Sequence, residues 1–192
     1  MELATGIILG IALSAAVGFR IFVPFLVMSI ATRMGLMDIS SGFEWIASTP
    51  ALVLLITATF FEMLAYFIPW FDNILDVIAA PLAVICGSIV MASAIVEIEP
   101  WIKWTMAIIA GGGTAGLIHG ATTATRAAST ITTAGIGNPL VNILEIGSSF
   151  IISVLAVFLP IVAIIFVLLI VVFITKRYFK RKKKQAVLRK AG

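Results

Sequence analysis

The chain has 192 residues, of which 61% are hydrophobic and only 11% are charged, and its mean hydropathy is +1.19. This composition excludes an ordinary soluble globular domain and predicts an all-α integral membrane protein. Each crossing of a bilayer needs about 20 residues, so the length allows five to six transmembrane helices. We expect one transmembrane domain over residues 1–175, with kinked or half-helices in it.

The net charge of +4 is concentrated at one end, because nine of the thirteen Lys and Arg residues lie between Lys176 and Lys190. They directly follow a long apolar run. By the positive-inside rule, residues 176–192 form a basic cytoplasmic tail that meets anionic lipid headgroups. Nucleic acid is not expected as a partner.

The first apolar segment, residues 4–32, is interrupted by Arg20 and Pro24. A proline inside a helix kinks or breaks it, so this segment is either one kinked span or a span plus a half-helix. Residues 41–44 match a capping box that would open a short interfacial helix. The second segment starts at Thr49-Pro50, a good cap pair, and carries a glutamate in its interior.

Residues 69–76, PWFDNILD, separate the second segment from a third over residues 77–95. The acids here are either solvated at an interface or offer oxygen ligands or a proton site at a helix break. No spacing in the chain indicates a metal, and no cofactor is expected. The polar residues concerned are Asp72, Asn73 and Asp76.

A fourth segment begins near Trp104 and contains three successive glycines, Gly111, Gly112 and Gly113. Such a triplet is either an unwound segment lining a cavity or a place where another backbone packs closely. The fifth segment, residues 138–175, is too long for one upright crossing. Either Pro160 divides it into two spans or its start is a half-helix.

A weak internal repeat relates residues 4–95 to residues 104–175. Gly10 to Arg20 aligns with Gly116 to Arg126, and each arginine is followed by a loop, a capped helix start and a helix with one glutamate. Three spans between the copies would give an inverted repeat, as in many secondary transporters. The alternative is that small-residue helices with prolines align by composition alone.

Two polar stripes occur at helical spacing on the fourth and fifth segments. Their short AGIGN link lets them face each other as an antiparallel pair, which makes Arg126 and Glu145 candidate ion-pair partners, as are Arg20 and Glu62. The stripes are His119, Thr122, Arg126, Ser129 and Thr133 on one segment, and Asn138, Asn142, Glu145 and Ser149 on the other.

A charge at the middle of a bilayer costs at least about 2.5 to 3.5 kcal/mol, so these stripes must face a protein interior or a water-filled cavity. The alternative to a functional cavity is structural. Hydroxyls hydrogen-bond between packed helices, and a buried ion pair can be retained only to neutralise its arginine. Enzyme signatures are missing, since one His and one Cys provide neither a metal set nor a nucleophile with its base.

Three segments, SAAVGFRIFVPFL, PWFDNILDVIAAPLAVICG and the glycine-rich stretch ending in GNPLVNILE, resemble a bacterial membrane family known only as a domain of unknown function, the forty-one twenty-six group. The likeness covers Ser14 to about Pro160. It implies a helical protein of the bacterial inner membrane and brings no established activity.

We therefore expect a small transporter or translocase in which Arg20 and Arg126 bind an anionic solute or a lipid phosphate head group. Arginines, histidine and hydroxyls together suit phosphate or carboxylate, and we expect His119, Thr122, Ser129, Thr133 and Asn142 to contribute to this site. Glu62 and Glu145 would pair with the arginines or carry coupling protons or cations. The alternative is a scaffold or accessory subunit without transport. A chain this short is also a candidate homodimer.

Overall fold

The computed structural model describes residues 3–66, 69–96, 98–170 and 172, and the regular elements in this part of the chain are helices. The all-helical expectation is confirmed. The basic tail, residues 176–192, lies outside the described residues. In chain order the elements are α1 (Leu3–Phe19), α2 (Phe22–Arg33), the 3-10 helix η1 (Glu44–Ala47), α3 (Thr49–Ala65), α4 (Pro69–Ala94), α5 (Pro100–Met106), the π-helical segment η2 (Ala107–Gly112), α6 (Gly113–Thr133), α7 (Asn138–Phe158) and a helix over Pro160–Ile170.

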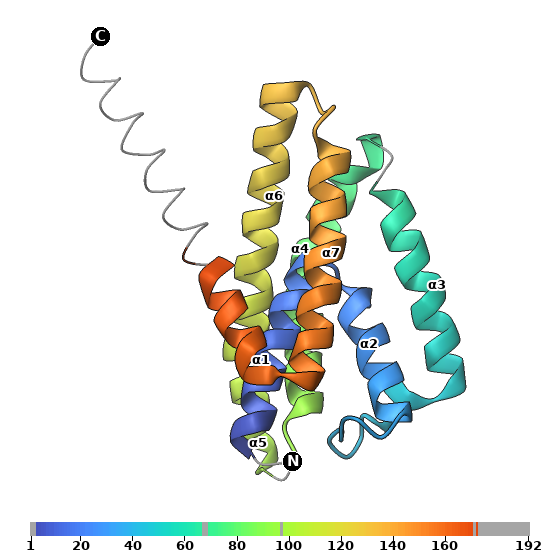
Figure 1. Ribbon diagram of the computed structural model, residues 1–192, viewed down its shortest axis with the longest axis vertical. Coiled ribbons are helices and arrows are strands. Elements are labelled where there is room, and N and C mark those ends of the chain that lie inside the picture. The colour runs from blue at the N-terminus through green and yellow to red at the C-terminus, as the bar shows by residue number, and fades with distance from the viewer. Residues whose placement is uncertain (1–2, 67–68, 97, 171, 173–192) are drawn as a thin grey trace, which may run out of the picture.

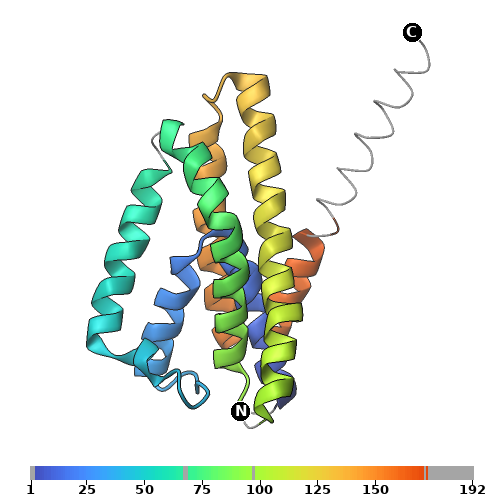
Figure 2. The same cartoon turned by 180° about the vertical axis from the view of Figure 1, so that it is seen from behind.

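Helix α1 lies at the centre of the bundle and packs against α4, α6 and α7 (Figure 1). It is apolar on every side and rich in glycine and alanine, which is the pattern of a fully buried helix. Small side chains let neighbouring backbones approach it closely. The α2–α3 hairpin lies to one side of this core, where α3 packs mainly on α2 (Figure 2).

The first apolar segment forms two helices, α1 and the shorter α2, rather than one kinked helix. The break falls at Arg20, four residues before Pro24. A continuous helix would need the N–H of residue 24 to bond the Arg20 carbonyl, and proline has no N–H and clashes with that carbonyl. Pro24 instead sits in the first turn of α2, where a missing N–H costs nothing.

Other boundaries differ from expectation for local reasons. The segment PWFDNILD is not a helix break, because α4 already begins at Pro69 and includes it. Helix α3 is capped by the Ser48 hydroxyl, which accepts from the Ala51 N–H at 3.2 Å, one residue earlier than the expected Thr49. Glu44 accepts from the Gly42 N–H rather than closing a capping box. Division at Pro160 is confirmed, since α7 ends at Phe158.

The glycine triplet is helical rather than unwound: Gly111 and Gly112 end η2, where they allow close packing against α4, and Gly113 begins α6. A Cβ atom at Gly111 would lie 2.6 Å from the Gly87 carbonyl oxygen and 2.5 Å from the Met91 Cβ. Gly112 is similarly close to Ser88, whereas Gly113 has open space around it. Close backbone approach, the second expected alternative, explains the first two glycines.

Candidate functional site

The two arginines that interrupt the apolar segments of the sequence meet in one buried cluster. Arg20 and Arg126 are 1% and 3% exposed, although one lies at the α1–α2 break and the other in the middle of α6. Both contact the same carboxylate oxygen, Glu145 Oε2 on α7: Arg20 Nη2 lies 2.9 Å and Arg126 Nη1 lies 3.2 Å from it. The predicted Arg126–Glu145 pair is therefore present, and a second guanidinium shares it.

Arg20 does not form the expected ion pair with Glu62. The Glu62 carboxylate instead accepts hydrogen bonds from the backbone N–H groups of Ile21 and Phe22, at 2.8 and 3.1 Å. These N–H groups begin α2 and have no partners within their own helix. A carboxylate is favourable there because a helix N-terminus carries a partial positive charge. Glu62 thus stabilises the break that positions Arg20.

Asp76 provides a third carboxylate, from the second turn of α4. Its Oδ1 lies 2.7 Å from Arg126 Nη2, and its side chain is 10% exposed. The side chains of Asp72 and Asn73 lie outside the part of the chain that the structure describes. Asp76 is thus a predicted acid of this segment whose described side chain contacts an arginine.

Tyr66, just after α3, is a member of the cluster that the sequence reasoning missed. Its ring lies under both guanidiniums, with the Cζ of Arg20 3.9 Å and that of Arg126 4.6 Å from the ring centroid. Such cation–π contacts are strengthened away from water. A signal was available, because Tyr66 follows Glu62 by four residues and so shares its helix face.

The polar stripe of α6 divides along its length. His119 and Thr122 are buried, 5% and 6% exposed, two turns and one turn before Arg126 respectively. Ser129 is half-buried and Thr133 is exposed, where its hydroxyl accepts from the Gly137 N–H in the link to α7. The stripe therefore reaches the cluster only in its first half.

The hydroxyls of α6 bond mainly to their own helix. Thr122 donates to the His119 carbonyl at 2.9 Å, and Thr125, Thr130, Thr132 and Thr133 also donate to carbonyls three or four residues earlier. This back-bonding satisfies a hydroxyl without water. Ser149 on α7 joins the helices directly, since it donates to the Ala16 carbonyl on α1 at 2.9 Å.

Several donors in the cluster have no hydrogen-bond partner among the described residues. They belong to Arg20, at Nε and Nη1, and to Asn142, at Nδ2. The Asn142 oxygen is already occupied, because it accepts from Arg20 Nη2. His119 Nε2 is also buried without a partner. Buried polar groups are nearly always satisfied, so these atoms point to water or a bound ligand with acceptor oxygens.

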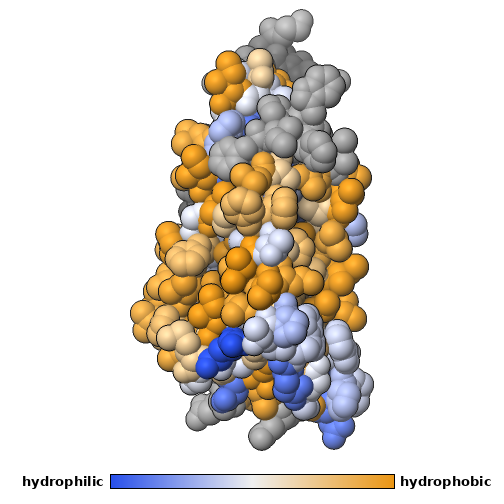
Figure 3. All heavy atoms as spheres, turned by 90° about the vertical axis from the view of Figure 1, so that its right-hand side faces the viewer, coloured by the Kyte–Doolittle hydropathy of each residue, from blue (hydrophilic) through white to orange (hydrophobic). Residues whose placement is uncertain are grey.

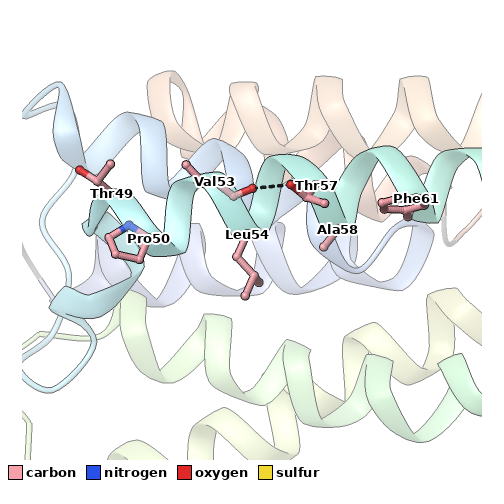
Figure 4. Close-up of a pocket in the computed structure, with 7 residues that line it drawn as sticks. All are labelled: Thr49, Pro50, Val53, Leu54, Thr57, Ala58 and Phe61. Atoms are coloured by element: carbon pink, nitrogen blue, oxygen red, sulfur yellow. Dashed lines mark hydrogen bonds between the residues drawn. The ribbon is translucent and has the colours of Figure 1, made fainter.

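A shallow groove of about 730 Å³ lies elsewhere, along the outer side of α3 from Thr49 to Phe61 (Figure 4). Its lining is apolar except for Thr49 and Thr57, and Thr57 bonds back to the Val53 carbonyl. The groove is therefore suited to hydrocarbon rather than to a charged group. Phe61 at its end precedes Glu62 of the cluster.

Fold and site together define a helical bundle with an internal arginine–carboxylate cluster. The family model described as Domain of unknown function (DUF4126) matches residues 7–180, and the chain belongs to this family. The resemblance read from the sequence is thereby confirmed. No curated protein and no solved structure matches the chain.

Proposed function

We propose that this protein is a small membrane transporter or translocase that carries an anionic group, a phosphate or a carboxylate, through the Arg20–Arg126 cluster. The observation that carries the proposal is Arg20 itself. It is 1% exposed, yet two of its guanidinium nitrogens have no hydrogen-bond partner among the described residues. An anion with several oxygens would accept hydrogen bonds from these donors and from Asn142 Nδ2.

Membrane embedding is supported by the surface. Residues 75–94 of α4 and the whole of α7 are long and apolar enough to cross a bilayer. Large apolar side chains of α3 are also exposed, among them Val53 at 59%, Leu54 at 64% and Phe61 at 62%. In Figure 3 an apolar band lies above a polar lower end. Such a large exposed apolar surface is uncommon on a soluble monomer.

The remaining features of the proposal follow from the sequence. We propose five to six spans in the bacterial inner membrane, with the basic residues 176–192 in the cytoplasm against anionic lipid. The two arginines come from the two halves that the weak repeat relates. A broken helix beside the site, here α1–α2, is a device that transporters use to bring polar groups to the middle of the membrane.

The test is transport in liposomes that contain the purified protein. Labelled phosphate and labelled succinate report a free anion, and a fluorescent phospholipid reports movement of a lipid phosphate. We expect one of these probes to move, and Arg20→Gln to reduce its rate at least ten-fold. Arg33→Gln is the matched control, because Arg33 is exposed and bonds to the Ala47 carbonyl outside the cluster. Failure of all three probes with folded wild-type protein would overturn the proposal.

A scaffold without transport is the second candidate, and the direct ion pairs favour it. Arg126 contacts Asp76 of α4 and Glu145 of α7, so the cluster is suited to holding three helices together. In that case Arg20→Gln would lower the unfolding temperature, while wild-type liposomes would carry none of the probes.

A further inference from the structure

Glu145 holds a position that a bound anion would need. Its Oε2 is the acceptor for guanidinium nitrogens from two different elements, at 2.9 Å from Arg20 and 3.2 Å from Arg126. The Glu145 side chain is 4% exposed. Among the described contacts it is the carboxylate that joins both arginines. A phosphate or carboxylate oxygen with the same two donors would have to take its place.

The charges of the cluster oppose an additional anion. The described side chains comprise two guanidiniums, of Arg20 and Arg126, against three carboxylates, of Glu62, Asp76 and Glu145. If all are ionised, their sum is already negative. Repulsion between like charges is strong where water is excluded. Anion binding therefore requires that one carboxylate lose its charge at the same time.

The other titratable groups are less suited to this role than Glu145. Glu62 on α3 accepts from two backbone N–H groups of α2 and does not lie between the guanidinium groups. Asp76 on α4 contacts Arg126 on α6 and accepts from the Tyr66 hydroxyl at 3.5 Å. His119 on α6 lies two helical turns before Arg126 and is not a member of the contacts that meet at Glu145 Oε2.

We infer that Glu145 is an internal counter-anion, which a substrate anion replaces when Glu145 takes up a proton. This inference rests on the proposed transport function. The proton from solution bonds to a Glu145 carboxylate oxygen, the contacts from Arg20 and Arg126 pass to an oxygen of the anion, and release reverses both steps. When the bound group carries a single negative charge, one proton and that charge enter together, so the charge of the cluster is unchanged. Transport is consequently coupled to protons.

The coupling is measured in the same liposomes, with the probe that wild-type protein carries. An acidic exterior should drive accumulation of the probe inside, and a trapped dye should report acidification of the interior. Glu145→Gln cannot take up the proton. We expect the ratio of accumulation driven by the pH gradient to exchange at equal pH to fall at least ten-fold in this variant, whatever its absolute rate of exchange. Glu99→Gln, at an exposed position, should behave as wild type.

A measurement on the wild type makes the inference independent of the variant. Calorimetric titration of the purified protein with the probe measures how many protons are taken up on binding, when it is repeated in buffers of different ionisation enthalpy. The pH is kept above the pKa of the probe, so that the probe itself does not change protonation state. One proton per anion is expected, and none would overturn the inference. Wild-type transport that is the same with and without a pH gradient would also overturn the inference, but it would leave the proposed function intact. Absence of any wild-type transport would instead refute the proposed function.

Discussion

The two arginine segments of this protein share a sequence pattern but have different backbones. A glycine lies ten residues before each arginine, Gly10 before Arg20 and Gly116 before Arg126. The helix ends at the first arginine but continues through the second to Thr133. The residue four positions later accounts for the difference. It is Pro24 in one segment, which has no N–H, and Thr130 in the other, which has one.

The difference has consequences for the site. At Arg20 the helix break leaves backbone N–H groups free to donate hydrogen bonds to the Glu62 carboxylate. The backbone at the break therefore takes part in the site together with the Arg20 side chain. At Arg126 the backbone is satisfied within α6, and only the guanidinium takes part. Pro24, which lies outside the cluster, thus accounts for the helix end beside Arg20, and Arg126 has no such helix end beside it. Both arginines nevertheless meet at Glu145.

The largest expected effect comes from removing that shared partner. Glu145→Ala leaves Arg20 without its carboxylate, while Arg126 keeps Asp76. Breaking a buried ion pair costs about 3 to 5 kcal/mol of unfolding free energy. Unfolding of the detergent-solubilised protein measures this loss, with the exposed Glu99→Ala as control. Equal stability of the two variants would mean that the cluster does not join the segments.

The next effect tests the cause of the break. Thr130→Pro places in α6 the proline that interrupts α1–α2, and should cost about 3 kcal/mol because it removes the N–H that bonds the Arg126 carbonyl. Thr130→Ala is the control for the lost hydroxyl. The reverse change, Pro24→Ala, should cost about 1 kcal/mol through lost packing and a more flexible unfolded chain. If both changes destabilise equally, proline position does not explain the two backbones.

A smaller effect separates the two segments by packing. A Cβ at Gly18, two residues before Arg20, would lie 2.6 Å from the Ala115 carbonyl oxygen and from the Ile118 Cβ, whereas Gly120, six residues before Arg126, has nothing within 4 Å. Gly18→Ala should therefore cost about 1 to 3 kcal/mol by overpacking. Gly120→Ala should stabilise α6 by about 0.5 to 1 kcal/mol. Opposite signs in thermal unfolding are the expected result.

The smallest effect concerns Tyr66, which both arginines contact. Tyr66→Phe removes only a long hydrogen bond to Asp76, at 3.5 Å, and should change the unfolding free energy by less than about 1 kcal/mol. Tyr66→Leu also removes the ring and should cost about 1 to 2 kcal/mol more, since a desolvated cation–π contact contributes about that much. Equal stability of Phe and Leu variants would show that the ring contacts contribute little.

Much of the helical organisation was predictable because its signals are local. Proline chemistry predicts the division at Pro160 and, within one residue, the start of α3. Helical spacing predicts the pairing of Arg126 with Glu145. The start of α4 was misjudged because the polar segment 69–76 was interpreted as a break, although Pro69 is a favourable first helical residue. The membrane setting and the relation between the two halves stay predictions.

The amino-acid sequence by itself determined that this chain forms helices, where prolines end them and which polar residues share a helix face. Each of these properties depends on neighbours within a few positions. Only the tertiary structure decided that Arg20 contacts Glu145 rather than Glu62, that Glu62 closes a helix end, and that Tyr66 lies beneath both guanidiniums. The reason is geometric. The partner of a buried charge depends on which helices cross near it, and the periodicity along one helix does not indicate how that helix packs against the others.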